Sequence, residues 1–287
     1  MEIGTGIPNT VLDPPGELFV GWARRAEERG FSTLATIGRL AYPSHDDLVA
    51  LAAAAGATER IRLFTNILLA PIFPTAILAK QTATLARVSS GRFRLGVGVG
   101  ARPDDFALAG ASFEGRGRRF EEQLEALHAV WRGEPFPGTE ERVAPPAPDG
   151  RVPILFAGQP RFAAPRAARW NGGFTIGGAP AEQASIAADE FRQAYRDAGG
   201  AGDPHVAALA YFSLGEEHTD ESLVNLRSYY AYLGDWTEAI AQGAAREPSD
   251  LRDRIKAYED AGIDELLLDP TVANLDQVDR AADIVFS

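Results

Sequence analysis

The most informative segment of this 287-residue chain is Arg92-Phe93-Arg94-Leu95-Gly96-Val97-Gly98-Val99-Gly100. Its apolar, β-branched and glycine-punctuated character is typical of a strand that is buried on both faces. A charged amphipathic helix is predicted shortly afterwards, over residues 117–131. At the exit of the strand, Gly98 and Gly100 leave room for a flat ligand or another backbone to approach closely. The stretch therefore predicts a buried strand that ends in a glycine-lined mouth.

The same glycine spacing has a plainer interpretation, because it can simply relieve packing at the end of a strand. It is not the fingerprint of a dinucleotide-binding fold. No helix begins at once, and no acidic residue closes a second strand about 20 residues later. The rest of the chain must therefore decide between a ligand site and packing.

Composition narrows the classes of protein to consider. The chain is 45% hydrophobic, has no cysteine and carries a formal charge of −12. This composition argues against disulfides, thiolate chemistry, cysteine-bound zinc and nucleic-acid binding, and the four scattered histidines give no metal motif. We find no leader of signal-peptide type and no apolar run long enough to span a membrane. The expectation is a cytoplasmic protein with a small-molecule ligand, and with no metal, nucleic acid or membrane as partner.

Short apolar runs alternate with longer amphipathic ones along the whole chain. Strands are predicted at residues 3–8, 31–38, 61–69, 92–98, 152–157, 174–177, 206–214 and 266–268. Helices are predicted at residues 15–29, 45–58 (with Ser44 as N-cap), 75–88, 117–131, 163–170, 181–198 and 275–285. Residues 219–261 hold further helical segments, and the proline-rich residues 133–153 predict a surface loop.

This order predicts an α/β chain folded as a single (β/α)₈ TIM barrel over residues 1–287, with a helical segment inserted between strands seven and eight. An open, doubly wound sheet is the alternative. In a barrel the active site lies at the carboxyl ends of the strands, and glycines recur there at Gly38, Gly98, Gly158 and Gly177-Gly178. The recurrence favours a large flat ligand across the mouth.

One strand exit also predicts an anion site. Gly158-Gln159-Pro160-Arg161 directly precedes a helix, and free backbone N–H groups beside an arginine suit a phosphate. Gly177-Gly178 opens the next loop, where barrels commonly hold the other side of a phosphate. The alternative is that Arg161 is simply a solvated residue of the first helical turn.

Several motifs together resemble one family. They are Ala57-Thr58-Glu59-Arg60-Ile61-Arg62-Leu63, residues 79–93, Gly96-Val97-Gly98-Val99-Gly100 leading to residues 116–122, Asn171-Gly172-Gly173-Phe174, and residues 261–266. With these motifs the chain resembles the luciferase-like monooxygenase superfamily over nearly its whole length. The resemblance implies a barrel that binds FMN, or alternatively the deazaflavin coenzyme F420, across its mouth.

The resemblance also implies site residues. Asn66 and Ile67 would lie against the flavin ring, at a bulge where many members have a non-prolyl cis peptide. Gly98, Val99 and Gly100 would border the ring and ribityl chain, and Gly158, Gln159, Pro160 and Arg161 would hold the phosphate. The remaining implied cofactor contacts are Ile7, Gly38, Thr65, Gly177 and Gly178.

Two departures from the family bear on the cofactor. Bacterial luciferases have an arginine at the position of Val99 and a Glu-Ser pair at Gly158-Gln159, so Arg161 or Arg102 would have to compensate for these phosphate ligands. Several deazaflavin enzymes have Asp or His where Ile37-Gly38-Arg39 stands here. FMN and F420 therefore both remain open.

His45 is the candidate general acid or base, because the unperturbed pKa of histidine is about 6.5. A surface position at the start of a helix is the alternative for this residue. Arg39 could face the substrate. Asp104 and Asp105 are expected to be solvated, and the tyrosines at 229, 230 and 232 are expected to pack on the barrel rather than to line a pocket.

The leading hypothesis is a flavin-dependent monooxygenase that uses reduced FMN and dioxygen on a small organic substrate. The alternatives are F420-dependent hydride transfer and a non-catalytic flavin-binding barrel. A separate flavin reductase is an expected partner. The family also implies a homodimer formed through the helices after strands two and three, where the alanine-rich residues 50–55 would permit close approach.

Overall fold

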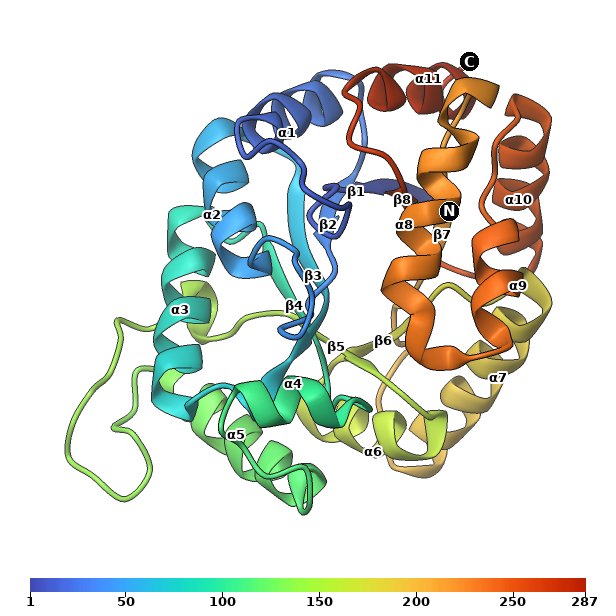
Figure 1. Cartoon of the computed structure of the whole chain (residues 1–287). Coiled ribbons are helices and arrows are strands. Elements are labelled where there is room, and N and C mark those ends of the chain that lie inside the picture. The colour runs from blue at the N-terminus through green and yellow to red at the C-terminus, as the bar shows by residue number, and fades with distance from the viewer.

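A closed parallel barrel is the central feature of the computed structural model, which describes residues 1–287 (Figure 1). Its strands are β1 (Glu2–Gly6), β2 (Thr33–Thr36), β3 (Arg62–Leu69), β4 (Phe93–Gly98), β5 (Ile154–Ala157), β6 (Gly173–Ile176), β7 (Val206–Phe212) and β8 (Glu265–Pro270). They pair in chain order, and β1 closes the barrel against β8 through partners such as Glu2 and Glu265. The predicted barrel is confirmed, and the open-sheet alternative is wrong.

Helices surround the barrel and connect successive strands (Figure 1). They are α1 (Leu18–Glu28), α2 (Asp47–Ala57), α3 (Thr75–Val88), α4 (Pro103–Leu108), α5 (Arg116–Trp131), α6 (Pro160–Trp170), α7 (Ala181–Asp197), α8 (Thr219–Tyr230), α9 (Trp236–Gln242), α10 (Pro248–Asp260) and α11 (Asp276–Val285). Helices α8, α9 and α10 all fall between β7 and β8, which confirms the predicted insertion. No helix combines the length and apolarity that crossing a membrane would need.

The starts of several helices differ from the predictions, and α1 begins at Leu18 instead of residue 15. Helix α2 begins at Asp47, because the Asp46 side chain rather than Ser44 caps it by accepting the N–H of Val49 at 2.8 Å. Helix α6 begins at Pro160, whose fixed φ suits a first helical position. The short helix α4 also begins with a proline and was not predicted, since six residues are too few to show a periodic pattern.

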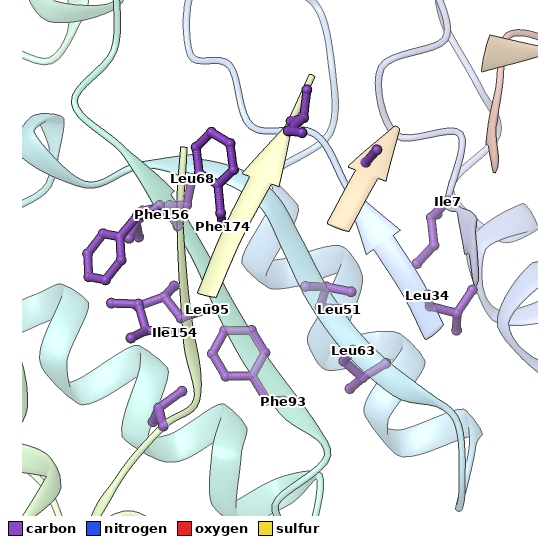
Figure 2. Packing of buried hydrophobic residues seen from close by; sticks show 14 of the residues in the cluster. Ile7, Leu34, Leu51, Leu63, Leu68, Phe93, Leu95, Ile154, Phe156 and Phe174 are labelled. Atoms are coloured by element: carbon purple, nitrogen blue, oxygen red, sulfur yellow. The ribbon is translucent and has the colours of Figure 1, made fainter. Parts of the chain in front are cut away.

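Two layers of apolar side chains fill the fold. A small inner layer fills the barrel and is formed by Ala35, Phe64, Leu155, Ala207 and Leu267. A large outer layer packs the strands against the surrounding helices, and Figure 2 shows Leu34, Leu63, Phe93 and Leu95 of the strands together with Leu51 of α2. The interior is therefore solid, and any ligand site must lie at an end of the barrel.

The amino ends of the strands are tied together by a buried carboxylate. Glu265, which is fully buried, accepts hydrogen bonds from Thr33 Oγ1 at 2.5 Å and Arg94 Nη2 at 2.6 Å, and its carboxylate lies 3.0 Å from His205 Nε2. Burial alone would raise the pKa of Glu265, but the hydrogen bonds and the charge of Arg94 lower it to about 2. This end of the barrel is thus closed by ionic bonds, whereas the opposite end carries the site.

Candidate active site at the barrel mouth

The carboxyl ends of the strands surround a cavity of about 480 Å³, which we call the mouth cavity. Residues that follow β2, β4, β5 and β6 line it, together with Asn66, Ile67 and Leu69 of β3 and Leu209 and Tyr211 of β7. The volume falls within the range of roughly 300–1,000 Å³ that is usual for small-molecule sites. The position agrees with the end of the barrel where the active site was predicted.

Most of the predicted site residues meet at this cavity. Those that line it are Gly38, Arg39, Asn66, Ile67, Gly98, Val99, Gly100, Gly158, Gln159, Gly177 and Gly178. They come from segments far apart in the sequence, which only the closed barrel brings together.

Two of the implied cofactor contacts lie beneath the cavity instead of lining it. Ile7 is buried in the outer core, and its N–H donates to the carbonyl of Ala35 at 2.7 Å. Thr65 is fully buried, and its hydroxyl exchanges hydrogen bonds of 2.9 and 3.0 Å with the backbone of Gly96. Neither residue lines the mouth cavity, so neither is in a position to contact a ligand there.

The last two residues of the predicted phosphate loop lie outside the lining of the cavity. Pro160 starts α6 and lacks an N–H, and Arg161 is exposed. The guanidinium of Arg161 donates from Nε to Gln159 Oε1 at 3.0 Å and stacks over Phe162, 4.7 Å from the ring centroid. Since Gln159 and Phe162 do line the cavity, Arg161 stands at its outer rim.

His45 is not brought to the cavity. Its side chain is exposed, and its ring lies edge-on to Phe19 with centroids 4.8 Å apart. Its backbone N–H donates to the carbonyl of Asn9 at 3.0 Å. The chain turns away from the mouth between Arg39 and His45, so the placement supports the surface alternative and not the acid–base hypothesis.

Asn66 occupies the most informative position in the cavity wall. The pairing of β3 with β4 shifts register between Thr65 and Leu68, and the Asn66–Ile67 peptide is cis, as the family resemblance implied for this position. Thr175 donates its hydroxyl to Asn66 Oδ1 at 2.7 Å. The amide nitrogen Nδ2 has no hydrogen-bond partner within the protein, which leaves two donors for a ligand.

The glycines of the mouth serve two different purposes. A Cβ on Gly158 or Gly177 would meet nothing within 4 Å, so these positions open onto free space. A Cβ on Gly98 would come within 2.4 Å of Ile67 Cδ1, and one on Gly178 within 2.9 Å of the Tyr211 ring. The packing interpretation is therefore correct for Gly98 and Gly178, and room for a ligand is left at Gly158 and Gly177.

A group of tyrosines forms the wall opposite these glycines. Tyr211, Tyr229, Tyr230 and Tyr232 all line the cavity, so the expectation that the last three only pack on the barrel is wrong. The hydroxyls of Tyr211 and Tyr230 are 2.6 Å apart and hydrogen-bonded. Burial raises the pKa of both phenols, which keeps them neutral.

Arginine side chains fasten this aromatic wall to the strand exits. Arg102 lies over the ring of Tyr232 at 3.8 Å, and its Nη2 donates to Asp104 at 3.0 Å. Arg39 donates from Nη1 to the carbonyl of Tyr229 at 3.1 Å and also reaches Asp104, at 3.4 Å. These contacts hold the inserted helices over the mouth, and they were not predicted.

Two acidic residues at the mouth are buried, although one of them was expected to be solvated. Asp105 accepts the N–H groups of Leu40 and Ala41 at 2.9 and 2.6 Å, and so fixes the segment after β2. Asp47 lies directly behind Gly38, and burial, together with the Asp46 carboxylate, raises the pKa of Asp47 to about 7. Arg102 stands 3.7 Å from Asp105 and partly offsets its charge.

Comparison with known proteins identifies a family that matches nearly the whole chain, and solved structures with the same fold. Residues 1–278 match the family described as luciferase-like monooxygenases. The monooxygenase RslO1 from Streptomyces bottropensis is 24% identical, with a TM-score of 0.82 over 99% of this chain and 97% of its own. An F420-dependent secondary alcohol dehydrogenase, in complex with an F420–acetone adduct, is 19% identical, with a TM-score of 0.79 over 99% and 98%.

A third similar structure contains FMN. It is the oxygenating constituent of 3,6-diketocamphane monooxygenase from Pseudomonas putida, a type II Baeyer–Villiger monooxygenase solved in complex with FMN. It is 17% identical to this chain, with a TM-score of 0.75 over 99% of this chain and 98% of its own. At these identities the three structures show a shared fold.

Proposed function

The chain belongs to the luciferase-like monooxygenase family and is an oxidoreductase, and from this premise we propose that it binds reduced FMN in the mouth cavity and oxygenates a small organic substrate with dioxygen. When bound, FMN supplies the electrons and the centre for oxygen chemistry. The protein supplies binding, orientation and exclusion of water. Reduced FMN would come from a separate flavin reductase.

The free amide of Asn66 is the observation that carries this proposal. Asn66 lines the cavity, and its buried Nδ2 has no hydrogen-bond partner within the protein, while Thr175 donates to Oδ1. A buried donor without a partner costs about 1–3 kcal/mol, so a ligand acceptor at this point is favoured. The pyrimidine edge of a flavin carries such acceptors, and the residues present therefore fit the group.

The shape and polarity of the cavity fit the ring as well. Free space at Gly158 and Gly177 accommodates a planar ligand, and Ile37, Ile67 and Leu209 give apolar surface on which it can lie. The tyrosine wall covers the remaining side and excludes water from a reactive cofactor. The neutral phenols of Tyr211 and Tyr230 can donate one hydrogen bond to a substrate oxygen, because their mutual bond uses only one of their two hydrogens.

We place the FMN phosphate at the start of α6. In the first turn of this helix Pro160 lacks an N–H, and the N–H groups of Phe162 and Ala163 donate to the carbonyl of Gln159 at 2.9 and 3.1 Å. The N–H of Arg161 is therefore the one left for a phosphate, and the Arg161 side chain stands beside it at the rim. Arg161 would exchange its contact with Gln159 for the phosphate. Arg102 is bound to Asp104 and stacked on Tyr232, so it is the weaker candidate for this role.

Titration separates the cofactors directly. The purified chain is mixed with FMN, reduced FMN or F420 while absorbance and fluorescence are recorded, and oxygen uptake is then followed with the reduced protein. We expect saturable binding of reduced FMN and oxygen uptake that rises with substrate. Failure to bind any of the three below roughly millimolar concentration, a limit of about −4 kcal/mol, would exclude the proposal.

F420-dependent hydride transfer is the second candidate. It is favoured by an excess of arginine in the lining of the mouth, where Arg39, Arg102 and Arg116 face one carboxylate, that of Asp105, on a chain of net charge −12. Such a lining suits a cofactor with a longer anionic tail. Tight binding of F420 without oxygen uptake would favour this function over the first.

A further inference from the structure

A second cavity, of about 730 Å³, lies beside the mouth cavity, and we call it the lateral cavity. Its wall is formed by the loop between β6 and α7 together with parts of α7, α9 and α10. It shares three lining residues with the mouth cavity, namely Gly178, Leu209 and Tyr211. The two cavities are therefore neighbours across a thin partition.

Tyr211 forms this partition. Its ring fills the space that a side chain on Gly178 would need, at 2.9 Å from the Cβ position. Its hydroxyl is held by Tyr230 at 2.6 Å, and Tyr230 belongs to the wall of the mouth cavity. A molecule that extends from one cavity into the other must pass the edge of this ring.

From this arrangement we propose that the lateral cavity binds the apolar body of the substrate, whose reactive end reaches past Tyr211 into the mouth cavity. The inference rests on the proposed function, because it assumes that chemistry takes place at the mouth. It adds the class of substrate, which is an extended, uncharged and largely apolar molecule.

The wall of the lateral cavity carries the apolar part of this argument. Leu209, Leu233, Trp236 and Ile240 line it together with several alanines. Trp236 is 69% exposed in the chain alone, although large aromatic side chains are normally covered. A ligand in the lateral cavity would cover part of this indole, which gives binding a hydrophobic driving force.

The charges of the lateral cavity argue against an anionic substrate. Asp250, Asp253 and Arg254 line it, so carboxylates outnumber the guanidinium, and none of the three forms an ion pair within the protein. The Nε of Arg254 is buried and has no hydrogen-bond partner. It can donate to one neutral oxygen, such as a carbonyl or hydroxyl, on the distal part of the substrate.

The neutral fluorescent probe N-phenyl-1-naphthylamine tests this site without any cofactor, because its emission rises in apolar surroundings. We expect saturable binding to the full chain. Ile240→Trp and Ala257→Trp, which fill the lateral cavity from α9 and α10, should each weaken binding at least about tenfold. Ile186→Trp is the matched control, since Ile186 is 56% exposed on α7 and does not line the cavity.

Flavin titration of the same variants separates this inference from the proposed function. Unchanged flavin affinity together with weakened probe binding supports a distinct lateral site. If the probe does not bind, or binds all three variants as tightly as the unmodified chain, the proposal of a lateral binding site is wrong. This holds even where flavin still binds. If the probe behaves as expected but no flavin or F420 binds, the cavity binds apolar ligands and the proposed function fails.

Discussion

Replacing Asn66 by aspartate tests the contact that carries the proposed function. The change keeps the shape of the side chain and an oxygen for the Thr175 hydroxyl, which donates to Asn66 at 2.7 Å. It replaces the free Nδ2 donor with a carboxylate oxygen that repels the acceptor atoms of a flavin. A lost hydrogen bond and the added repulsion should cost about 1.4–2.8 kcal/mol, which is about 10- to 100-fold in Kd.

The assay is fluorescence titration with FMN and with reduced FMN under anaerobic conditions. Thr175→Val is the matched control, because it removes the hydrogen bond to Asn66 Oδ1 but leaves both N–H donors of Nδ2 in place. We expect this variant to lose only about threefold in flavin affinity. Circular dichroism confirms that both variants are folded. Unchanged flavin affinity of the Asn66→Asp variant would contradict a hydrogen bond from Nδ2 to the flavin, as would a larger loss of affinity in Thr175→Val than in Asn66→Asp.

Four further changes test other parts of the structure. Glu265→Gln should destabilise the chain by about 3 kcal/mol at pH 7, because the pKa of Glu265 is about 2 in the folded chain and ordinarily 4.5. This contribution to stability is complete above pH 4.5 and is lost as the pH falls towards 2. Urea unfolding should therefore show a smaller difference in the free energy of unfolding between the two proteins at about pH 3 than at about pH 7. Gly158→Val should abolish flavin binding, because the side chain fills open space in the cavity and strains a φ of +112°. The control is Gly56→Val on the exposed side of α2, where a Cβ would also meet no neighbour, and it should leave the Kd for flavin unchanged. Arg102→Ala should remove a cation–π contact worth about 1 kcal/mol, and amide hydrogen exchange should quicken over residues 229–236 while the barrel strands stay protected. His45→Gln should leave oxygen uptake essentially unchanged, and a loss of about 100-fold would instead restore the acid–base role.

The order of elements could be predicted from the sequence because burial imposes a local signature. Buried strands are short and apolar throughout, and the helices around them are amphipathic. Closure into a barrel was predicted from the number of alternating strands and helices, and not from such a local signature. It depends on pairing between Glu2 and Glu265, which lie at opposite ends of the chain and carry no local signal for each other.

The candidate site was predictable in position more than in detail. Glycines at strand exits indicated the mouth correctly, but they did not reveal that Ile67 fills the space beside Gly98. The tyrosines offered a signal that was missed. Successive helical residues point about 100° apart, so Tyr229, Tyr230 and Tyr232 cannot all face the core beneath one helix, and some of them must face a second surface.

The two ends of the barrel differ in how their buried polar groups are hydrogen-bonded. At the amino ends of the strands, Glu265 has its charge paired and its oxygens bonded. At the mouth, buried polar atoms of four lining side chains have no hydrogen-bond partner within the protein: Arg39 Nε, Asn66 Nδ2, Arg102 Nη1 and Asp105 Oδ2. Each such group lowers the stability of the chain alone by about 1–3 kcal/mol, and a polar ligand that supplies a partner recovers part of this. A polar ligand at the mouth therefore gains binding energy from these groups, since the barrel holds them in place before the ligand arrives.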